Sequence, residues 1–393
     1  MSLNLFEVSA LLSTLILVGF YGSYSMLCFW YLRNKKAVSP QPLDENLLPK
    51  LTLIVPTYNE APVIPRKFVS LKQLVYPRNK LQVVFVDGGS TDGTPDLIEQ
   101  LSDGQLDVQL VRQSTREGYN NAVKEGFRAA TGDMISITGA ETEFEPDALL
   151  QMATNLSLRN VGAVTGRERI RNLGDGLSPS LEAGYRNLYD FIRCAESEMD
   201  STFDIKGEIC AARREVVAKI VDNPAILQKG CVEGCFSFQS RVLGLRTVYV
   251  ETAVYYENAP SSLAESFAQQ IRRGATLIQE FLLFKKLVLN RRYGKFGLVI
   301  APAHFAMLLV MPFIFGLMIL SLSLVVATGG IWEILLTMGA VAATLCSKRL
   351  QAFVKAQLSL IAATIGLLVG LDTQKFRRLP STRVLNQQVD LTR

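Results

Sequence analysis

Long apolar runs near both ends of the chain flank a central region in which short apolar runs alternate with amphipathic ones. The first long run, residues 8–30, has the length of a helix that crosses a bilayer, and Arg33, Lys35 and Lys36 follow it. Basic residues collect on the cytoplasmic side of membrane segments, so the end of this run is expected to face the cytoplasm. Glu7 stands where a cleavable leader carries basic residues, which favours a retained anchor over a signal peptide.

Three further apolar runs follow the central region, at residues 298–326, 331–346 and 352–371. The middle run is short for a membrane helix, and Lys355 and Gln357 interrupt the last one. We expect about three C-terminal spans. Basic residues follow both of the last two runs, so either the final tail lies outside the cytoplasm or one run does not cross the membrane.

The central region combines the periodicities of strands and helices. Its short apolar runs are bounded by turn residues, as in parallel strands that are buried on both faces. We expect strands at residues 51–56, 83–87, 134–138, 163–165 and 246–250, and helices at 94–101, 121–130, 146–156 and 182–199. The alternation of the two kinds of element predicts an α/β fold.

Residues 263–296 mix apolar side chains with several arginines and lysines. A basic amphipathic segment of this kind is typical of a membrane surface, and a solvated helix that packs on the domain is the alternative. The predicted organisation is an anchor at 1–36, a proline-containing linker at 37–50, a cytoplasmic domain at 51–262, interfacial helices at 263–296, membrane helices at 297–372 and a basic tail at 373–393.

Composition and charge narrow the classes of function. Of the 393 residues, 49% are hydrophobic and 20% are charged, which is too apolar for an ordinary soluble enzyme but leaves enough charge to solvate one domain. The net charge of +5 is too small to favour nucleic acid as a partner. The single histidine, His304, lies in an apolar run, so a Ser-His-Asp triad or a multi-histidine zinc site lacks its members. Carboxylates are left to perform acid–base chemistry.

The six cysteines do not form the paired pattern of a zinc ribbon. Cys231 and Cys235 could share one helical face, but buried thiols are the simpler interpretation. Free thiols favour a reducing, cytoplasmic environment for the domain.

Polar motifs follow the predicted strands. Residues 56–60 read PTYNE after the first strand, and Asp87 ends the second strand before the turn GGSTDGT. Open α/β sheets bind ligands at the carboxyl ends of their strands, so a nucleotide is expected there. Glu141 follows the third strand, where a carboxylate could hold Mg²⁺ or Mn²⁺ on a diphosphate. The next acidic residues, Glu143, Glu145 and Asp147, are interpreted as favouring a helix N-terminus.

The order of these motifs resembles the membrane-bound family 2 glycosyltransferases, which include cellulose, hyaluronan and chitin-oligosaccharide synthases and polyprenyl-phosphate sugar transferases. The resemblance implies a GT-A type domain that binds a nucleotide diphosphate sugar, with transfer to a lipid or glycan acceptor. It implies substrate contacts for Pro56, Thr57, Tyr58, Glu60 and Asp87, a divalent metal on Glu141, a catalytic base at Glu233, and a Q-x-x-R motif at Gln269 and Arg272. Arg272 and Arg273 could clamp the leaving diphosphate, while lipid headgroups are an alternative partner for Arg273.

Several positions depart from the family pattern. Gly88 stands where a second Asp is usual, Tyr119 replaces a Lys, Gly139 replaces the first Asp of the metal motif, Gly234 replaces the usual catalytic Asp, and Arg273 replaces a Trp. The change at Gly234 leaves Glu233 as the candidate base. A phosphate acceptor is already ionised and needs no strong base, which favours polyprenyl phosphate.

We therefore expect an inverting sugar transferase in the cell membrane, with a cytoplasmic catalytic domain and a lipid-linked or polyprenyl-phosphate acceptor. A processive polysaccharide synthase is one alternative, which the loss of the Trp at Arg273 disfavours. A catalytically silent relative that binds a nucleotide sugar is another, because glycines occupy three positions that are acidic in the family.

Overall fold

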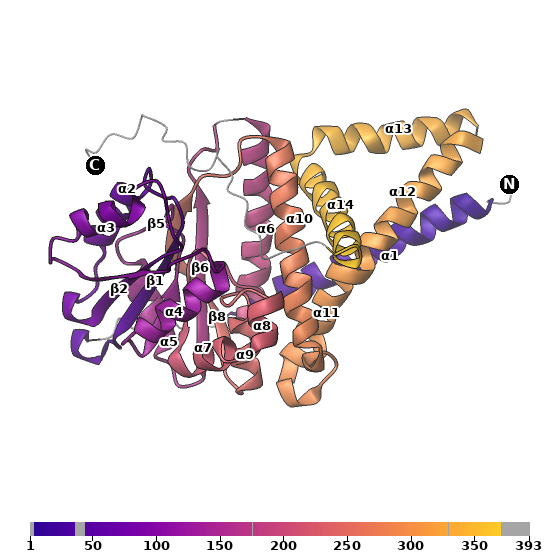
Figure 1. Ribbon diagram of the computed structural model, residues 1–393. Coiled ribbons are helices and arrows are strands. Elements are labelled where there is room, and N and C mark those ends of the chain that lie inside the picture. The colour runs from indigo at the N-terminus through magenta and orange to yellow at the C-terminus, as the bar shows by residue number, and fades with distance from the viewer. Residues whose placement is uncertain (1–3, 36–43, 175, 329, 371–393) are drawn as a thin grey trace.

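The apolar runs of the central region pair into one mixed sheet. Its strands are β1 (Leu51–Thr57), β2 (Leu81–Asp87), β3 (Asp107–Arg112), β4 (Met134–Ile137), β5 (Glu143–Phe144), β6 (Val161–Ile170), β7 (Cys210–Arg213) and β8 (Arg246–Glu257). In the computed structural model, which describes residues 4–35, 44–174, 176–328 and 330–370, they lie in the order β3-β2-β1-β4-β7-β6-β8-β5 (Figure 1). The first four strands of this order are parallel, and β7 runs antiparallel to β4 and β6.

Helices cover both faces of the sheet, because successive strand residues point to opposite sides. Leu53 and Val55 of β1 pack into one apolar core, and Ile54 between them packs into a second. The helices around the first core are α2 (Ile64–Gln73), α3 (Thr94–Leu101) and α5 (Ala148–Leu156). Those around the second are α4 (Tyr119–Ala129), α7 (Arg214–Val221), α8 (Pro224–Lys229) and α9 (Phe236–Val242). The predicted α/β architecture is confirmed.

Two long helices, α6 (Leu177–Met199) and α10 (Leu263–Leu283), stand between the sheet and the helices that complete the chain (Figure 1). A third apolar core joins them to their neighbours, and it contains Phe203, Phe281 and Phe296. The apolar face of α10 therefore packs against protein, including the last long helix of the chain. The expected interfacial segment, residues 263–296, is thus a helix with one face packed on protein, followed by short helical turns at Lys285–Leu287 and Arg291–Tyr293, and its contact with a membrane surface stays a prediction.

Three helices in the described part of the chain are long and apolar enough to cross a membrane: α1 (Leu5–Arg33), the continuous helical segment Phe296–Thr328 and α14 (Lys348–Leu368). The segment Phe296–Thr328 contains α11 (Ala301–Phe305), α12 (Met311–Thr328) and two π-helical turns. The helix between the last two, α13 (Ile331–Cys346), has 16 residues. The described residues thus hold two C-terminal helices of spanning length, where three were expected.

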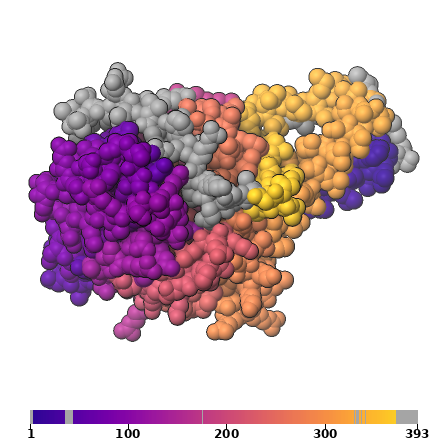
Figure 2. Space-filling model, in the orientation of Figure 1, coloured from indigo at the N-terminus to yellow at the C-terminus, as the bar shows by residue number. Residues whose placement is uncertain are grey.

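The indigo α1 and the orange α12 project together from the body of the molecule, while α14 packs against α10 and α6 (Figure 2). Large apolar side chains on α1, such as Leu11, Leu15 and Val18, are 51%, 58% and 66% exposed. Apolar surface on this scale marks contact with lipid or another protein, and the length of these helices favours lipid. The protein is a membrane protein. The first half of the expected linker (residues 37–43) and the basic tail (373–393) lie outside the described residues.

Gly166 allows β6 to lie close to β8. A Cβ at this position would meet the carbonyl oxygen of Ala253 and would lie 2.9 Å from Cδ1 of Ile209. We predict that Gly166→Ala lowers the free energy of unfolding by about 1–3 kcal/mol, since backbone must move to make room. Gly184 in α6 is the matched control, because a Cβ there meets nothing within 4 Å. Thermal unfolding in detergent should show Gly184→Ala as neutral or stabilising, and equal behaviour of the two variants would contradict the prediction.

Candidate active site

Three strand ends meet at one edge of the sheet. Thr57 of β1 pairs with Asp87 of β2, and Thr138, which follows β4, donates its backbone N–H to the carbonyl of Ile54 at 3.1 Å. Because these strands are parallel, the motifs that follow them in the sequence lie side by side. The sequence-predicted residues of the first three motifs are therefore brought together.

The first two motifs form one hydrogen-bonded unit. The Asp87 carboxylate accepts the backbone N–H groups of Gly89 (3.1 Å) and Ser90 (2.9 Å) as well as the Ser90 hydroxyl. Asn59 adopts a left-handed conformation with φ of 54°, donates its N–H to Ser90 Oγ (2.7 Å) and accepts the N–H of Thr91 (2.6 Å). Asp87 thus shapes the turn that follows it, while its predicted contact with a nucleotide stays a prediction.

The remaining residues of the PTYNE motif differ in exposure. Thr57 and Glu60 are buried, and the backbone N–H of Glu60 donates to Thr94 Oγ1 at 2.8 Å. Pro56 and Tyr58 are half-buried. The guanidinium of Arg116 lies over the Tyr58 ring, 4.1 Å from its centroid, so an aromatic face and a cation stand together at this edge.

A buried lysine holds the turn that carries Glu141. Lys67 Nζ donates to Thr138 Oγ1 (3.3 Å), to the carbonyl of Gly139 (2.9 Å) and to the carbonyl of Thr142 (2.9 Å). Burial lowers the pKa of Lys67 to about 7, while nearby Glu141 opposes this shift. One side chain of α2 therefore holds this turn in place through three hydrogen bonds.

Glu141 is the carboxylate that is predicted to hold a metal ion. Among the described residues no group of three or more His, Cys, Asp or Glu side chains is placed to hold a metal. Mg²⁺ and Mn²⁺ need no such cage when a diphosphate supplies oxygen ligands, because one or two carboxylates then suffice. The donor chemistry of Glu141 fits a metal that arrives with its substrate.

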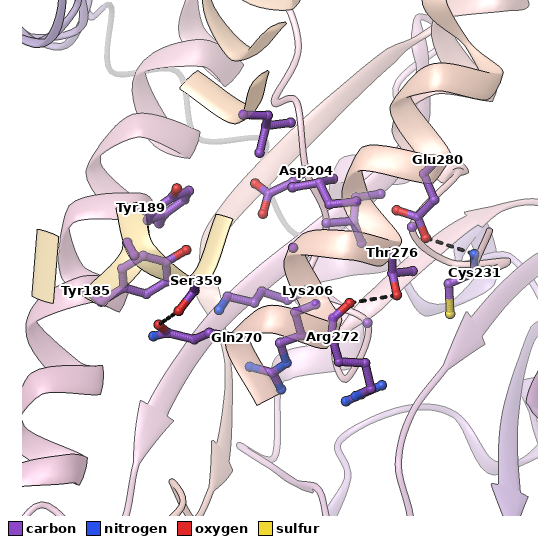
Figure 3. A pocket seen from close by; sticks show the side chains of 18 of the residues that line it. Tyr185, Tyr189, Asp204, Lys206, Cys231, Gln270, Arg272, Thr276, Glu280 and Ser359 are labelled. Carbon is purple, nitrogen blue, oxygen red and sulfur yellow. Dashed lines mark hydrogen bonds between the residues drawn. The ribbon is translucent and has the colours of Figure 1, made fainter. Parts of the chain in front are cut away.

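A cavity of about 230 Å³ lies between the sheet domain and the membrane helices (Figure 3). Its wall includes Tyr185 and Tyr189 of α6 on one side, and Arg272, Thr276 and Glu280 of α10 on the other. The segments 204–208 and 231–234 add Lys206, Glu208 and Glu233, and the membrane helices add Leu308, Ala356, Ser359 and Leu360. The cavity therefore combines carboxylates and cations from the domain with apolar side chains from the membrane helices.

Glu233 is a buried carboxylate in this wall. Its Oε1 accepts the Tyr119 hydroxyl at 2.8 Å and the Cys231 thiol at 3.0 Å. Its Oε2 is shut off from solvent without a hydrogen-bond partner among the described residues. Burial raises the pKa of Glu233, which would make it a stronger base than an exposed carboxylate.

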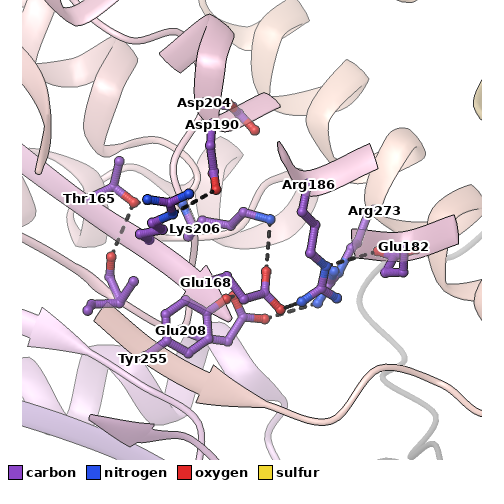
Figure 4. Close-up of polar contacts among 12 residues, drawn as sticks. Thr165, Glu168, Glu182, Arg186, Asp190, Asp204, Lys206, Glu208, Tyr255 and Arg273 are labelled. Carbon is purple, nitrogen blue, oxygen red and sulfur yellow. Dashed lines mark hydrogen bonds and ion pairs between the residues drawn. The ribbon is translucent and has the colours of Figure 1, made fainter. Parts of the chain in front are cut away.

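The cations around the cavity are largely paired with carboxylates (Figure 4). Arg193 holds Asp204 with two hydrogen bonds of 2.8 and 2.6 Å, and Lys206 pairs with Glu168 at 2.9 Å. Arg273 pairs with Glu208 at 3.1 Å. The half-buried Glu208 carboxylate is thus the observed partner of Arg273, and the diphosphate or lipid headgroup expected for Arg273 stays a prediction.

The cavity and the strand-end edge share a hydrogen bond. The Thr138 hydroxyl, which accepts from Lys67, donates to the backbone carbonyl of Glu208 at 3.0 Å. Glu208 precedes β7, which runs antiparallel to β4 and so begins where β4 ends. The turn that carries Glu141 is therefore adjacent to the cavity wall.

Comparison with known proteins agrees with this geometry. Residues 52–221 match the model of Glycosyl transferase family 2. The poly-beta-1,6-N-acetyl-D-glucosamine synthase of Staphylococcus aureus is 24% identical over 262 residues, which are 65% of this chain and 62% of that relative. The mannosyltransferase PcManGT from Pyrobaculum calidifontis, solved in complex with GDP-Man and Mn²⁺, is 28% identical with a TM-score of 0.80, over 93% of this chain and 99% of its own.

The chain carries a family 2 glycosyl transferase domain. Its fold is of the GT-A type, and the spanning-length helices accompany it as the motifs predicted. The chain spans 62% of the length of the synthase that it matches, so the likeness to that protein concerns the shared part.

One predicted residue of α10 lies apart from the cavity. Gln269 is buried, and its Oε1 has no hydrogen-bond partner among the described residues, but it does not line the cavity. Its neighbour Gln270 does, and Gln270 hydrogen bonds with Ser359 at 3.3 Å and with Glu182 at 3.1 Å. Arg272 lines the cavity, and its expected contact with the diphosphate stays a prediction.

Sequence reasoning missed Lys67 and Glu280. A signal for Lys67 exists, because it falls on the apolar face of α2 together with Ile64, Phe68 and Leu71, and a charge at such a position needs a partner. Glu280 carries no local signal, since its surroundings come from residues 230–234 and depend on the fold.

We predict that Lys67→Met loosens the turn that carries Glu141. Three oxygen acceptors would lose their donor, which costs about 1–3 kcal/mol for buried groups. Lys72→Met on the same helix is the control, because Lys72 makes an exposed ion pair with Asp103 that is worth about 1 kcal/mol at most. Hydrogen exchange of the amides of residues 138–142 should increase in Lys67→Met alone, and unchanged protection in that variant would refute the role given to Lys67.

Proposed function

We propose that the protein transfers one sugar from a nucleotide diphosphate sugar to a lipid-linked acceptor, with inversion at the anomeric carbon. The observation that carries the proposal is the cavity, whose wall joins Glu233 and Arg272 of the domain to Leu360 of α14, a helix of spanning length. An acceptor carried on a lipid could reach this cavity without leaving the membrane.

The donor would bind at the strand-end edge. Thr57, Tyr58 and Asp87 would contact the nucleotide, with Pro56 and Glu60 shaping the motif, and a buried strand end is the usual place for such a ligand. The likeness to PcManGT, whose structure holds GDP-Man and Mn²⁺, supports both the donor class and the divalent metal. Glu141 would hold the metal, which when bound offsets the charge of the diphosphate.

Transfer would occur where the edge meets the cavity. Arg272 would pair with phosphate oxygens of the leaving nucleotide diphosphate, because a guanidinium binds such oxygens through two hydrogen bonds. The acceptor oxygen would attack the anomeric carbon from the opposite side, near the carboxylates of the cavity. Single displacement of this kind inverts the configuration of that carbon.

The acceptor would place its lipid among the apolar side chains of the wall, which include Leu277, Leu308 and Leu360. Its reacting head would reach the carboxylates at the other end. The domain would face the cytoplasm, since Arg33 ends α1 and Lys35 follows it closely.

We predict that membranes containing the protein incorporate label from one nucleotide sugar into a short product that organic solvent extracts. Chelation of divalent cations should abolish the incorporation, because without the metal the negative diphosphate would meet the Glu141 carboxylate with no positive charge between them. A panel of radiolabelled donors with and without Mg²⁺ or Mn²⁺ measures both. Label in ethanol-insoluble polymer would instead identify a processive synthase, which is the activity that the name of the Staphylococcus aureus relative states. Nucleotide binding without any transfer would identify a catalytically silent relative.

We predict that a large side chain placed in the cavity impairs reaction with the acceptor but leaves binding of the donor unchanged. Ala356→Phe would place a ring in the cavity, and we expect the kcat/KM for the acceptor to fall about tenfold or more while the Kd of the nucleotide is unchanged. Leu358→Phe on the same helix is the control, because Leu358 is 44% exposed and faces away. Equal activity of the two variants would exclude this cavity as the acceptor site.

A further inference from the structure

A second carboxylate, Glu280, faces the cavity beside Glu233. It extends from the last turn of α10 toward residues 230–234, and its Oε1 accepts the backbone N–H of Cys231 at 2.8 Å (Figure 3). Only 3% of the residue is exposed. A buried carboxylate with one backbone donor is costly unless its surroundings or its function require it.

The glycines of the neighbouring segment make the room that Glu280 occupies. A Cβ on Gly234 would lie 2.5 Å from Cδ of Glu280 and closer still to both carboxylate oxygens. A Cβ on Gly230 would lie 3.3 Å from Cγ of the same side chain. The place where a side chain of residue 234 would begin is thus filled by a carboxylate from another helix.

The two carboxylates differ in how they can serve a substrate. Oε1 of Glu233 already accepts two hydrogen bonds, and its Oε2 is shut off from solvent. Glu280 is held by a single backbone N–H and lines the cavity. Burial raises the pKa of Glu280 well above its usual range, and the nearby Glu233 and Asp204 carboxylates raise it further.

We propose that Glu280 is the base that accepts the proton of the acceptor, and that the acceptor therefore reacts through a hydroxyl group. This inference rests on the proposed function. The acceptor oxygen forms the new bond to the anomeric carbon, the bond from that carbon to the diphosphate oxygen breaks with its electron pair leaving on the nucleotide diphosphate, and the hydroxyl proton passes to the Glu280 carboxylate.

The same arrangement disfavours a phosphate as the attacking group. A phosphate brought to this end of the cavity would face the carboxylate that has to be ionised to act as the base, and like charges repel strongly where water is excluded. The cations Arg193, Lys206 and Arg273 are already engaged with carboxylates. A neutral hydroxyl meets no such penalty, so the preference for polyprenyl phosphate that followed from Gly234 is replaced by a hydroxyl on a lipid-linked molecule.

The test begins with Glu280→Gln, which keeps the shape of the side chain and an oxygen for the Cys231 N–H. We expect kcat to fall by about 10²–10⁴-fold while the Kd of the nucleotide is unchanged. Glu265→Gln, on the first turn of the same helix, should retain the wild-type kcat. Wild-type turnover by Glu280→Gln would overturn the proposal.

A transplanted carboxylate separates a chemical role from a structural one. Gly234→Asp alone should be inactive or unstable, since its side chain would collide with Glu280. Gly234→Asp combined with Glu280→Ala removes the collision and returns a carboxylate to the same place, so it should recover at least about tenfold of the kcat that Glu280→Ala loses. Failure of the double variant to exceed Glu280→Ala, with nucleotide binding intact, would contradict the proposed base.

The product distinguishes the two acceptor classes. Mild acid releases a sugar from a lipid phosphate as the labelled monosaccharide, whereas a sugar attached to a hydroxyl stays joined to its acceptor. We expect no labelled monosaccharide from the wild-type product, and its release would overturn the hydroxyl acceptor. Absence of transfer from every donor by the wild-type protein would instead refute the proposed function itself.

Discussion

Charges buried between the sheet and the membrane helices hold the two parts of this protein together. Arg186 of α6 pairs with Glu168 of β6 and with Glu182 on its own helix, and Lys355 of α14 approaches Glu182 at 3.7 Å. Removing one partner of a buried pair costs about 3–5 kcal/mol, because the other charge is left without compensation. These ion pairs therefore fix how α6 and α14 lie against each other, which a purely apolar interface would not do. The cavity that both helices help to line takes its shape from this arrangement.

The contact between the sheet domain and the membrane helices also explains how both can act on the same donor and acceptor. The strand-end edge is built from backbone hydrogen bonds and small turns, and the Thr138 hydroxyl ties it to the segment that carries Glu208. Glu208 in turn pairs with Arg273 on α10. A donor at the edge and an acceptor in the cavity would thus meet across elements that are rigidly connected, which is the condition for positioning two reactants.

Much of the fold could be predicted from the sequence, because its strands are apolar runs that need two covered faces. The helix at residues 94–101 was predicted with its bounds, and β2 and β4 agree within a few residues. The amphipathic pattern of α10 identified a helix but not its partner. Its apolar face could equally meet lipid or protein, and α6 and α14 decided between them.

The site was harder to predict where it depends on contacts between distant segments. The motifs after β1, β2 and β4 were found because parallel strands place them at one edge. Gly234 indicated the loss of a carboxylate, yet the sequence could not show that Glu280 enters the space above it, 46 positions away along the chain. The short apolar run that forms α13 has the composition of a span but only 16 residues, so the third C-terminal span stays a prediction.

The central claim is that a lipid-linked acceptor enters the cavity between α10 and α14. Photo-crosslinking with an acceptor that carries a diazirine beside its reacting end, followed by peptide mapping of the wild-type protein in membranes, tests it directly. Our account predicts adducts on Leu263–Leu283 and Lys348–Leu368 that unlabelled acceptor competes away. Adducts confined to the exposed faces of α1 and α12, or adducts that no competitor reduces, would contradict it.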